Sequence, residues 1–437
     1  MTEQPIAELG VDGRKFAVLR SRKTSPYVLG AALSMMGDNV EHVLTYWVLW
    51  QTFHSPLLVG FQIVSHWLPF LLLSVYAGSL AERFDCRRLI QIAQGMFMLV
   101  SLSWGILFLT GTLQLWEACV LLVVHGMAGC LWGPAEQMML YDFAGPRQLP
   151  SAIRINATFR SLGVLLGPVV GSALLVGVGP TAGIFINIGV FLPLTIFLMT
   201  TRFTGHSRRA VVAGPRMTLI SAFKVLGTVR RNRVLVAMMI LAALSAVTVG
   251  AVLQNSMPLF ANLLGAGTAG LAYGVLLFAN GIGGVVGGFF LEASDWIKPN
   301  PRTAVVSAVL FGVTTVVFAI AGNYALAVIA LIVGGFARIT SDSTEMSIVQ
   351  LEAPDAERGR VIGAYSMFSR GMSTFSGVTV GVVGSLIGIP SSVLIGGAAL
   401  ALGALVIAAY MLSGRRSAAR SGRAGSRRRR RPASQPR

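Results

Sequence analysis

Apolar residues along this 437-residue chain gather in blocks of about twenty, and short polar segments separate the blocks. An α-helix of that length crosses the hydrocarbon core of a bilayer. The pattern predicts twelve spans, at about 27–50, 57–80, 89–110, 117–140, 154–177, 181–201, 234–261, 269–292, 303–321, 325–348, 361–387 and 392–412. The expected fold class is therefore an all-α integral membrane protein.

The polar segments alternate in charge along the chain. Six of them ("QTFHSP", "GTLQLW", "GVGPT", "NLLGAGTA", "AGNYA" and "IGIPS") contain neither Lys nor Arg. Basic residues gather instead in the N-terminal tail, the 82–88 turn, the 202–233 segment, the 294–302 and 352–360 turns, and the C-terminal tail. Short loops rich in Lys and Arg stay in the cytoplasm. We therefore expect a multi-pass protein of the cytoplasmic (inner) membrane with both termini inside the cell.

The segment 202–233 is longer than the other connections and divides the spans six and six. The expected organisation is a cytoplasmic tail (1–26), a six-helix bundle (27–201), a cytoplasmic linker (202–233), a second six-helix bundle (234–413) and a basic tail (414–437).

An internal repeat supports two pseudo-symmetric bundles. "GPAEQMMLYDFAGP" in the first half is similar to "DSTEMSIVQLEAP" in the second, which sets Glu136 against Glu345. Three residues also recur at a constant offset of 210 positions: Arg160, Gly167 and Gly171 correspond to Arg370, Gly377 and Gly381. Matches at one offset in equivalent spans favour a true repeat, as in many secondary transporters, over chance in a Gly-rich chain.

Composition agrees with the span pattern and narrows the function. The chain is 54% hydrophobic and 12% charged, about half the charged fraction of a soluble protein. No Gly-rich phosphate loop followed by Lys, no Cys/His pattern with metal spacing and no catalytic triad pattern is present. We therefore expect no cofactor, no metal and no enzyme activity.

The net charge of +18 is concentrated at the C-terminus, where the last 24 residues hold ten arginines and no acid. We expect this tail to be disordered and to bind anionic lipids. Nothing besides composition points to nucleic acid.

The stretch "GSLAERFDCRR" (78–88) places five charges in one turn between spans 2 and 3. It resembles the loop signature of the major facilitator superfamily, G-x-L-A-D-R-x-G-R-[KR], with Glu82 in place of Asp and Asp85 in place of the second Gly. The resemblance implies an inner-face latch that includes Gly78, with Glu82 against the N-terminus of span 11 and Arg83 or Arg87 paired with Asp142. The alternative is a stop-transfer cluster that only sets topology.

Two further stretches resemble elements of exporters in this superfamily. "GVLLGPVVGS" on span 5 is similar to G-x-x-x-G-P-x-x-G-G, which is associated with proton antiport; its members are Gly163, Gly167, Pro168 and Gly171. The alternative is a tight helix contact without meaning for transport. "LLVVHGMAG" on span 4 has the spacing of L-x-x-x-R-x-x-Q-G, but His125 replaces the arginine. The segments "PAEQMMLYDFAGPRQLPSAIRINATFRSLGVLLGP" and "APDAERGRVIGAYSMFSRG" resemble the bacterial branch of enterobactin-type siderophore exporters and macrolide-efflux-like proteins.

Ionisable residues inside spans are functional candidates, because charge at membrane depth is costly. On span 1, Asp38, Glu41 and His42 lie at helical spacing, and the resemblance places this span along a central cavity. No basic residue lies within one turn of Asp38, so we expect it to carry the coupling proton, with Glu41 as partner or substitute. The alternative is that Glu41 or His42 simply pairs with a basic residue across the bundle.

Arg160 and Arg370 are candidates either to hold an anionic cargo or to neutralise acids such as Glu136 and Glu345. We expect Arg338, Asp342 and Glu345 to pair along span 10, and His66 and His125 to be ordinary polar residues of the bundle.

The sequence as a whole indicates a secondary transporter that works by alternating access. The predicted activity is proton-coupled export of an amphiphilic small molecule such as a drug, siderophore or metabolite. A lipid or lysophospholipid flippase, and a non-transporting membrane sensor or scaffold, are the alternatives.

Overall fold

Helices and short turns account for all the residues that the computed structural model describes: 16–53, 56–207, 223–250, 269–294, 299–376 and 384–429, with a few positions between 253 and 264. No strand occurs in these ranges. The expected all-α membrane fold is confirmed. The repeat residues Gly377 and Gly381, most of the 202–233 linker and the two chain ends lie outside the described ranges.

The first half contains the helices α1 (Ala17–Arg20), α2 (Ser25–Phe53), α3 (Pro56–Arg83), α4 (Cys86–Thr110), α5 (Leu115–Gly177) and α6 (Gly179–Thr200). The 63-residue α5 is two spans joined at Gly145, whose φ of 68° and ψ of 171° break the helix. A residue without a Cβ adopts this backbone conformation readily. Spans 4 and 5 of the sequence analysis are thus the two legs of α5.

The second half contains α8 (Val225–Arg231), α9 (Arg233–Ser245), the π-helix η2 (Ala246–Gly250), α11 (Ala269–Ala293), α12 (Pro301–Ala319), α13 (Tyr324–Glu352), the 3₁₀ turn η3 (Asp355–Glu357), α14 (Arg358–Ser369), the 3₁₀ helix η4 (Gly371–Phe375), α16 (Gly384–Ile387) and α17 (Ile389–Arg429). Asn232, Asn300 and Asn323 begin α9, α12 and α13 by accepting hydrogen bonds from free N–H groups of the first turn.

Nine helices within the described ranges are long and apolar enough to cross a membrane. In this count α5 is one helix, although it contains two spans. The nine leave out α2, which carries the acids of span 1, and span 11, which breaks after α14. The expected twelve spans are therefore accounted for. One expectation is wrong: α17 continues as a helix to Arg429, through most of the tail that composition predicted to be disordered.

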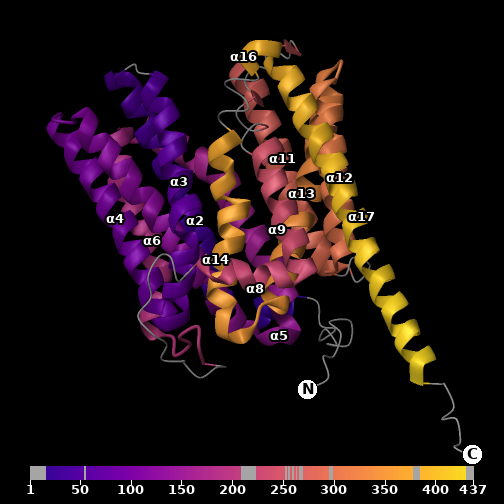
Figure 1. Ribbon diagram of the computed structural model, residues 1–437. Coiled ribbons are helices and arrows are strands. Elements are labelled where there is room, and N and C mark those ends of the chain that lie inside the picture. Colours follow the sequence, from indigo (N-terminus) through magenta and orange to yellow (C-terminus); the bar gives the residue numbers. More distant parts are fainter. Residues whose placement is uncertain are drawn as a thin grey trace, which may run out of the picture.

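The helices form two bundles that stand side by side, α2 to α6 in one and α9 to α17 in the other (Figure 1). Each bundle has its own apolar core, the first around Phe97 and Trp104 and the second around Phe311 and Phe318. Apolar side chains on the outer surfaces, among them Leu402 and Val406, are more than half exposed. This distribution is typical of a bundle surrounded by lipid rather than water.

The bundles meet at the ends of the spans that carry the basic 82–88 and 352–360 turns, which we call the basic face. There α3 crosses α14 with almost no side chains between the backbones. A Cβ on Gly78 would lie 2.1 Å from the carbonyl oxygen of Gly359, and one on Gly363 would lie 2.2 Å from that of Ser74. The Ser74 hydroxyl also donates to the Gly363 carbonyl at 2.9 Å. The basic face is closed in this structure.

We expect Gly363→Val to open the basic face, because its side chain would overlap the Ser74 backbone. Spin labels at Phe84 and Ala356, both exposed and in opposite halves, should move apart by several ångströms. The matched control is Gly189→Val on α6, where nothing lies within 4 Å of the added Cβ. Equal label distances in the Gly363→Val and Gly189→Val proteins would contradict this packing argument.

Candidate functional site

The two acids of span 1 meet a histidine from another helix. Asp38 and Glu41 lie three positions apart on α2, and both are buried. The Asp38 carboxylate is 2.8 Å from Nε2 of His125, and the Glu41 carboxylate is 2.9 Å from Nδ1 of the same ring. His125 comes from the first leg of α5, and Ser101 of α4 donates its hydroxyl to the other oxygen of Glu41. Three helices thus build one polar network inside an apolar bundle.

This network, Asp38–His125–Glu41, needs a proton that its members share. A neutral imidazole has one N–H donor and one lone pair, so it can donate to only one of two carboxylates. Holding both contacts requires an imidazolium ring, or a carboxylic acid that donates to the lone pair. The arrangement can therefore exchange a proton between carboxylate and ring with little movement of heavy atoms.

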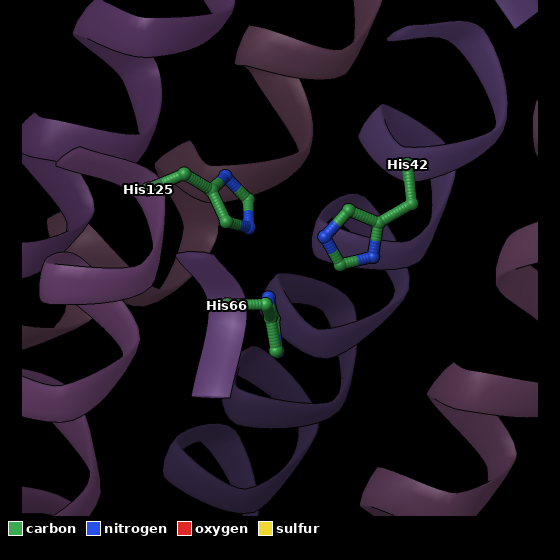
Figure 2. Close-up of side chains that lie close together, drawn as sticks. All are labelled: His42, His66 and His125. Atoms are coloured by element: carbon green, nitrogen blue, oxygen red, sulfur yellow. The ribbon is translucent and has the colours of Figure 1, made fainter. Parts of the chain in front are cut away.

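Two more imidazoles lie beside His125 (Figure 2). His42 of α2 and His66 of α3 have ring centroids 5.0 Å and 5.8 Å from that of His125, and 5.0 Å from each other. The Nδ1 atom of His66 is buried without a hydrogen-bond partner in the part of the chain described. The cluster joins three spans, so no local Cys/His spacing in the sequence reveals it.

The three rings have nitrogen atoms within 4.8 Å of one another, a separation compatible with a metal ion. The chemistry of His125 argues against that use, because both of its nitrogens already face carboxylates. Ligation would require His125 to give up one of these contacts. The cluster fits better as an extension of the proton-sharing network.

No base lies within one turn of Asp38 along span 1, but His125 contacts it from α5 across the bundle. His125 was expected to be an ordinary polar residue of the bundle. The one signal that could have singled it out was its position, since it stands where the resembled span-4 element has a buried arginine. His42 shares the α2 face but stacks on Tyr46 rather than contacting either acid.

The repeat arginines differ in their surroundings. The guanidinium of Arg160 donates to Glu136 at 2.7 Å and lies over the ring of Trp132. Asn156 donates to the other carboxylate oxygen of Glu136. Arg370 lies over the ring of Phe70 at 5.4 Å. No carboxylate of the described residues lies within 4 Å of Arg370.

Glu345, the repeat counterpart of Glu136, accepts hydrogen bonds from Ser341 at 2.7 Å and Tyr365 at 3.2 Å. An ion pair between Glu345 and Arg370, one of the two roles considered for this arginine, does not form. Along α13, Arg338 and Asp342 form a loose pair at 3.7 Å, and both side chains are close to half exposed.

At the basic face, Glu82 lies against the first turn of α14. Its carboxylate accepts the backbone N–H of Arg360 at 2.7 Å and the side-chain Nε of Arg360 at 2.8 Å. Arg87 is bound to Asp85 and to the Thr201 carbonyl. Of the two arginines that the resemblance offered as partners of Asp142, Arg83 and Arg87, the second is therefore excluded.

The Asp142 carboxylate accepts the N–H groups of Gly205 and Ser207 and fixes the start of the linker. Arg83 ends α3 next to Glu82.

A second acid bridges the halves at the same face and was missed from sequence. Glu292, at the end of α11, accepts bonds from Arg154 and Ser151 of α5 and from the Phe16 backbone N–H. It lies 210 positions after Glu82, the same offset as the arginine repeat, and Gly288 likewise follows Gly78. Searching the 78–88 stretch at that offset would have found it.

The span-5 glycines face span 1. An added Cβ would lie 2.5 Å from the Ala32 carbonyl at Gly163, 2.3 Å from Asn39 at Gly167 and 3.0 Å from Val43 at Gly171. The second leg of α5 continues as helix past Pro168 to Gly177. These glycines therefore set how closely α5 approaches the helix that carries Asp38 and Glu41.

Comparison with curated proteins finds several transporters. Over 103 residues the chain is 31% identical to the multidrug resistance protein MdtH of Aeromonas hydrophila, which is 24% of this chain and 25% of that protein. Identity to the staphyloferrin A transporter of Staphylococcus aureus is 22% over 35% of this chain and 38% of that one. Identity to the Na⁺, Li⁺, K⁺/H⁺ antiporter of Planococcus maritimus is 22% over 67% of this chain and 74% of that one. The chain thus spans only about a quarter of MdtH.

Solved structures share the fold. The human organic anion transporter MFSD10 superposes with a TM-score of 0.70 at 13% identity, covering 88% of this chain and 99% of that one. The Escherichia coli fucose:proton symporter gives 0.69 at 15% identity, with 89% and 99% coverage. A family model described as "Transmembrane secretion effector" matches residues 15–426. Together with the two-bundle fold, this match shows that the chain belongs to the major facilitator superfamily, a family of membrane transporters.

Proposed function

We propose that this transporter exports an amphiphilic small molecule from the cytoplasm in exchange for protons. The observation that carries the proposal is the Asp38–His125–Glu41 network, which requires a shared proton and lies within the spans of the first bundle. The named relatives include a multidrug resistance protein and a cation/proton antiporter, which supports coupled efflux.

The network is placed to sense movement of the neighbouring helices. It joins α2, α4 and α5, and α2 packs against the glycine face of the second leg of α5. A shift of α5 against α2 would change the spacing between His125 and the two acids. A change in protonation would in turn favour one helix arrangement over the other. Proton binding and alternating access are linked by this packing.

The basic face acts as the inner gate. Glu82 and Glu292 each cross from one half to the other. Glu292 accepts hydrogen bonds from the side chains of Ser151 and Arg154 on the second leg of α5, and Glu82 accepts the backbone N–H of Arg360 in the first turn of α14. The positive end of a helix dipole favours a carboxylate there. In the closed state described, the latch, built from Gly78, Glu82 and Arg83 with Arg360 opposite, holds the cytoplasmic side shut.

We propose that the protein lies in the bacterial cytoplasmic membrane with both termini in the cytoplasm, and the alternation of loop charges supports this orientation. Anionic lipids are the proposed partners of the first arginines of the C-terminal tail, because these follow directly on the last apolar turn of α17.

Asp38→Asn should abolish uphill export while leaving substrate exchange intact, because the amide mimics the protonated carboxyl but cannot release a proton. The measurement is efflux of a fluorescent amphiphile from proteoliposomes, with and without an imposed pH gradient. His125→Arg should also lose the response to the gradient, since a permanent cation keeps both acids ionised. Asp85→Asn, at the basic face, is the matched control. Normal gradient-driven export in Asp38→Asn would rule out this assignment.

Glu82→Gln should shift the protein toward an open basic face and slow transport. Loss of a carboxylate at a helix N-terminus costs up to about 2 kcal/mol in a partly buried site, or roughly a 30-fold change in the conformational equilibrium. The same spin-label pair reports the shift. Glu357→Gln is the control, because Glu357 also approaches Arg360, at 3.5 Å, but from the same half. If both variants leave the label distance unchanged, the stretch only sets topology.

Reporter fusions after Ser413 test the proposed orientation. A fluorescent protein joined there should fold and fluoresce in a bacterial host, whereas alkaline phosphatase should stay inactive, because the segment faces the cytoplasm. A fusion within the uncharged "AGNYA" loop should give the reverse. An active phosphatase after Ser413 would overturn the orientation and with it the assignment of the inner gate.

A further inference from the structure

Arg370 differs from five other arginines of the described ranges in having no ion pair with an acid of those ranges. Carboxylates lie within 4 Å of Arg154, Arg160, Arg338, Arg358 and Arg360. The guanidinium of Arg370 has neither an ion pair nor a hydrogen bond with any residue of the described ranges. A cation inside a membrane bundle carries a substantial desolvation cost, so its retention without a partner calls for an explanation.

Arg160, the repeat counterpart of Arg370, does have an acidic partner. In the first half, Arg160 and Glu136 neutralise each other at 2.7 Å. In the second half the corresponding acid, Glu345, is occupied by Ser341 and Tyr365. The same two residue types are present in both halves, yet only one pair forms. The second half therefore has an arginine without an ion pair among the described residues, whereas its counterpart in the first half is paired.

The backbone is also irregular around Arg370. The helix of span 11 ends at Ser369 and resumes as the 3₁₀ helix η4 directly after Arg370. The π-helix η2 of span 7 packs against η4, with the Cβ position of Gly250 3.7 Å from the Ser373 hydroxyl. The Thr374 hydroxyl in η4 is buried without a partner in the described ranges. Broken helices in transporters commonly surround the substrate site.

The surroundings of Arg370 come from both bundles. Its guanidinium lies over the Phe70 ring of α3 and 3.9 Å from the Cβ position of Gly133 on α5, so it points from the second half into the first. On α13, one turn apart near its middle, Arg338 and Asp342 are 43% and 48% exposed. Charges facing lipid there would be costly, so this exposure indicates that water reaches the space between the bundles.

We propose that Arg370 binds the acidic group of the transported molecule, which is therefore an amphiphilic organic anion. A carboxylate fits the planar guanidinium fork with two parallel hydrogen bonds. The apolar body of the same molecule packs on Phe70. The inference names the cargo class of the proposed exporter and rests on that function only for the direction of movement.

Binding to the full-length protein in lipid nanodiscs tests the proposal without any proton gradient. The probes are three naphthalene derivatives of similar size: 1-naphthaleneacetate, the neutral 1-naphthaleneethanol and the cationic 2-(1-naphthyl)ethylamine. A second series, in which a decyl chain replaces the naphthalene ring and the same three charge types are kept, covers the case in which the ring does not fit the site. We expect the anion to bind at least about tenfold more tightly than the neutral probe in one series, as a charge-assisted bidentate contact implies.

Arg370→Gln should remove this preference, and Arg370→Lys should restore part of it, because lysine keeps the charge but not the fork. The matched control is Arg338→Gln, which removes a water-exposed arginine that already has a partner, and it should keep the preference. Partial rescue by lysine separates a binding role from a loss of folding.

Equal binding of anionic and neutral probes by the wild-type protein, or an anion preference that survives in Arg370→Gln, would overturn the proposal. An anion preference that depends on Arg370, together with gradient-driven export that survives Asp38→Asn, would disprove the coupling site but leave this inference standing.

Discussion

A charge inside a hydrocarbon layer must be compensated, and this requirement accounts for the arrangement of ionisable side chains in the spans. Glu136 is held by Arg160 and Asn156, Glu345 by two hydroxyl groups, and the α2 acids by one imidazole. Each solution brings together residues from different helices or different turns. The polar contacts therefore fix how the apolar helices pack, because helix–helix packing in lipid lacks the hydrophobic drive it has in water.

The same requirement explains why the departures from symmetry carry functional meaning. The two halves share the acids Glu82 and Glu292, each of which binds the opposite half across the basic face. They also share the arginines Arg160 and Arg370. The two acids at the basic face have kept the repeat symmetry, whereas the surroundings of the two arginines within the spans have lost it. Transport needs a gate that closes evenly on both halves, but a substrate with one charged end needs only one countercharge.

The sequence predicts the fold well and the site only in part. Span length and loop charge depend on local composition, so the twelve spans could be read from the chain, and the 78–88 stretch could be placed at the domain contact through its resemblance. The partner of Asp38 could not, because His125 lies 87 positions away and depends on how α5 packs. The same holds for the missing Arg370–Glu345 pair. Residues at repeat positions are predictable, but which of them touch is decided by tertiary packing.

The backbone contact between α3 and α14 bears on the kinetics of the gate. At Gly78 and Gly359, and where Gly363 meets Ser74, the halves touch through main-chain atoms that have no rotamers to order. Fixing a long side chain at an interface costs up to about 2 kcal/mol of conformational entropy. This stripe avoids that loss, so the gate can close as a rigid-body movement with little internal rearrangement. Its opening and closing rates should then depend mainly on the few acids that bridge the halves.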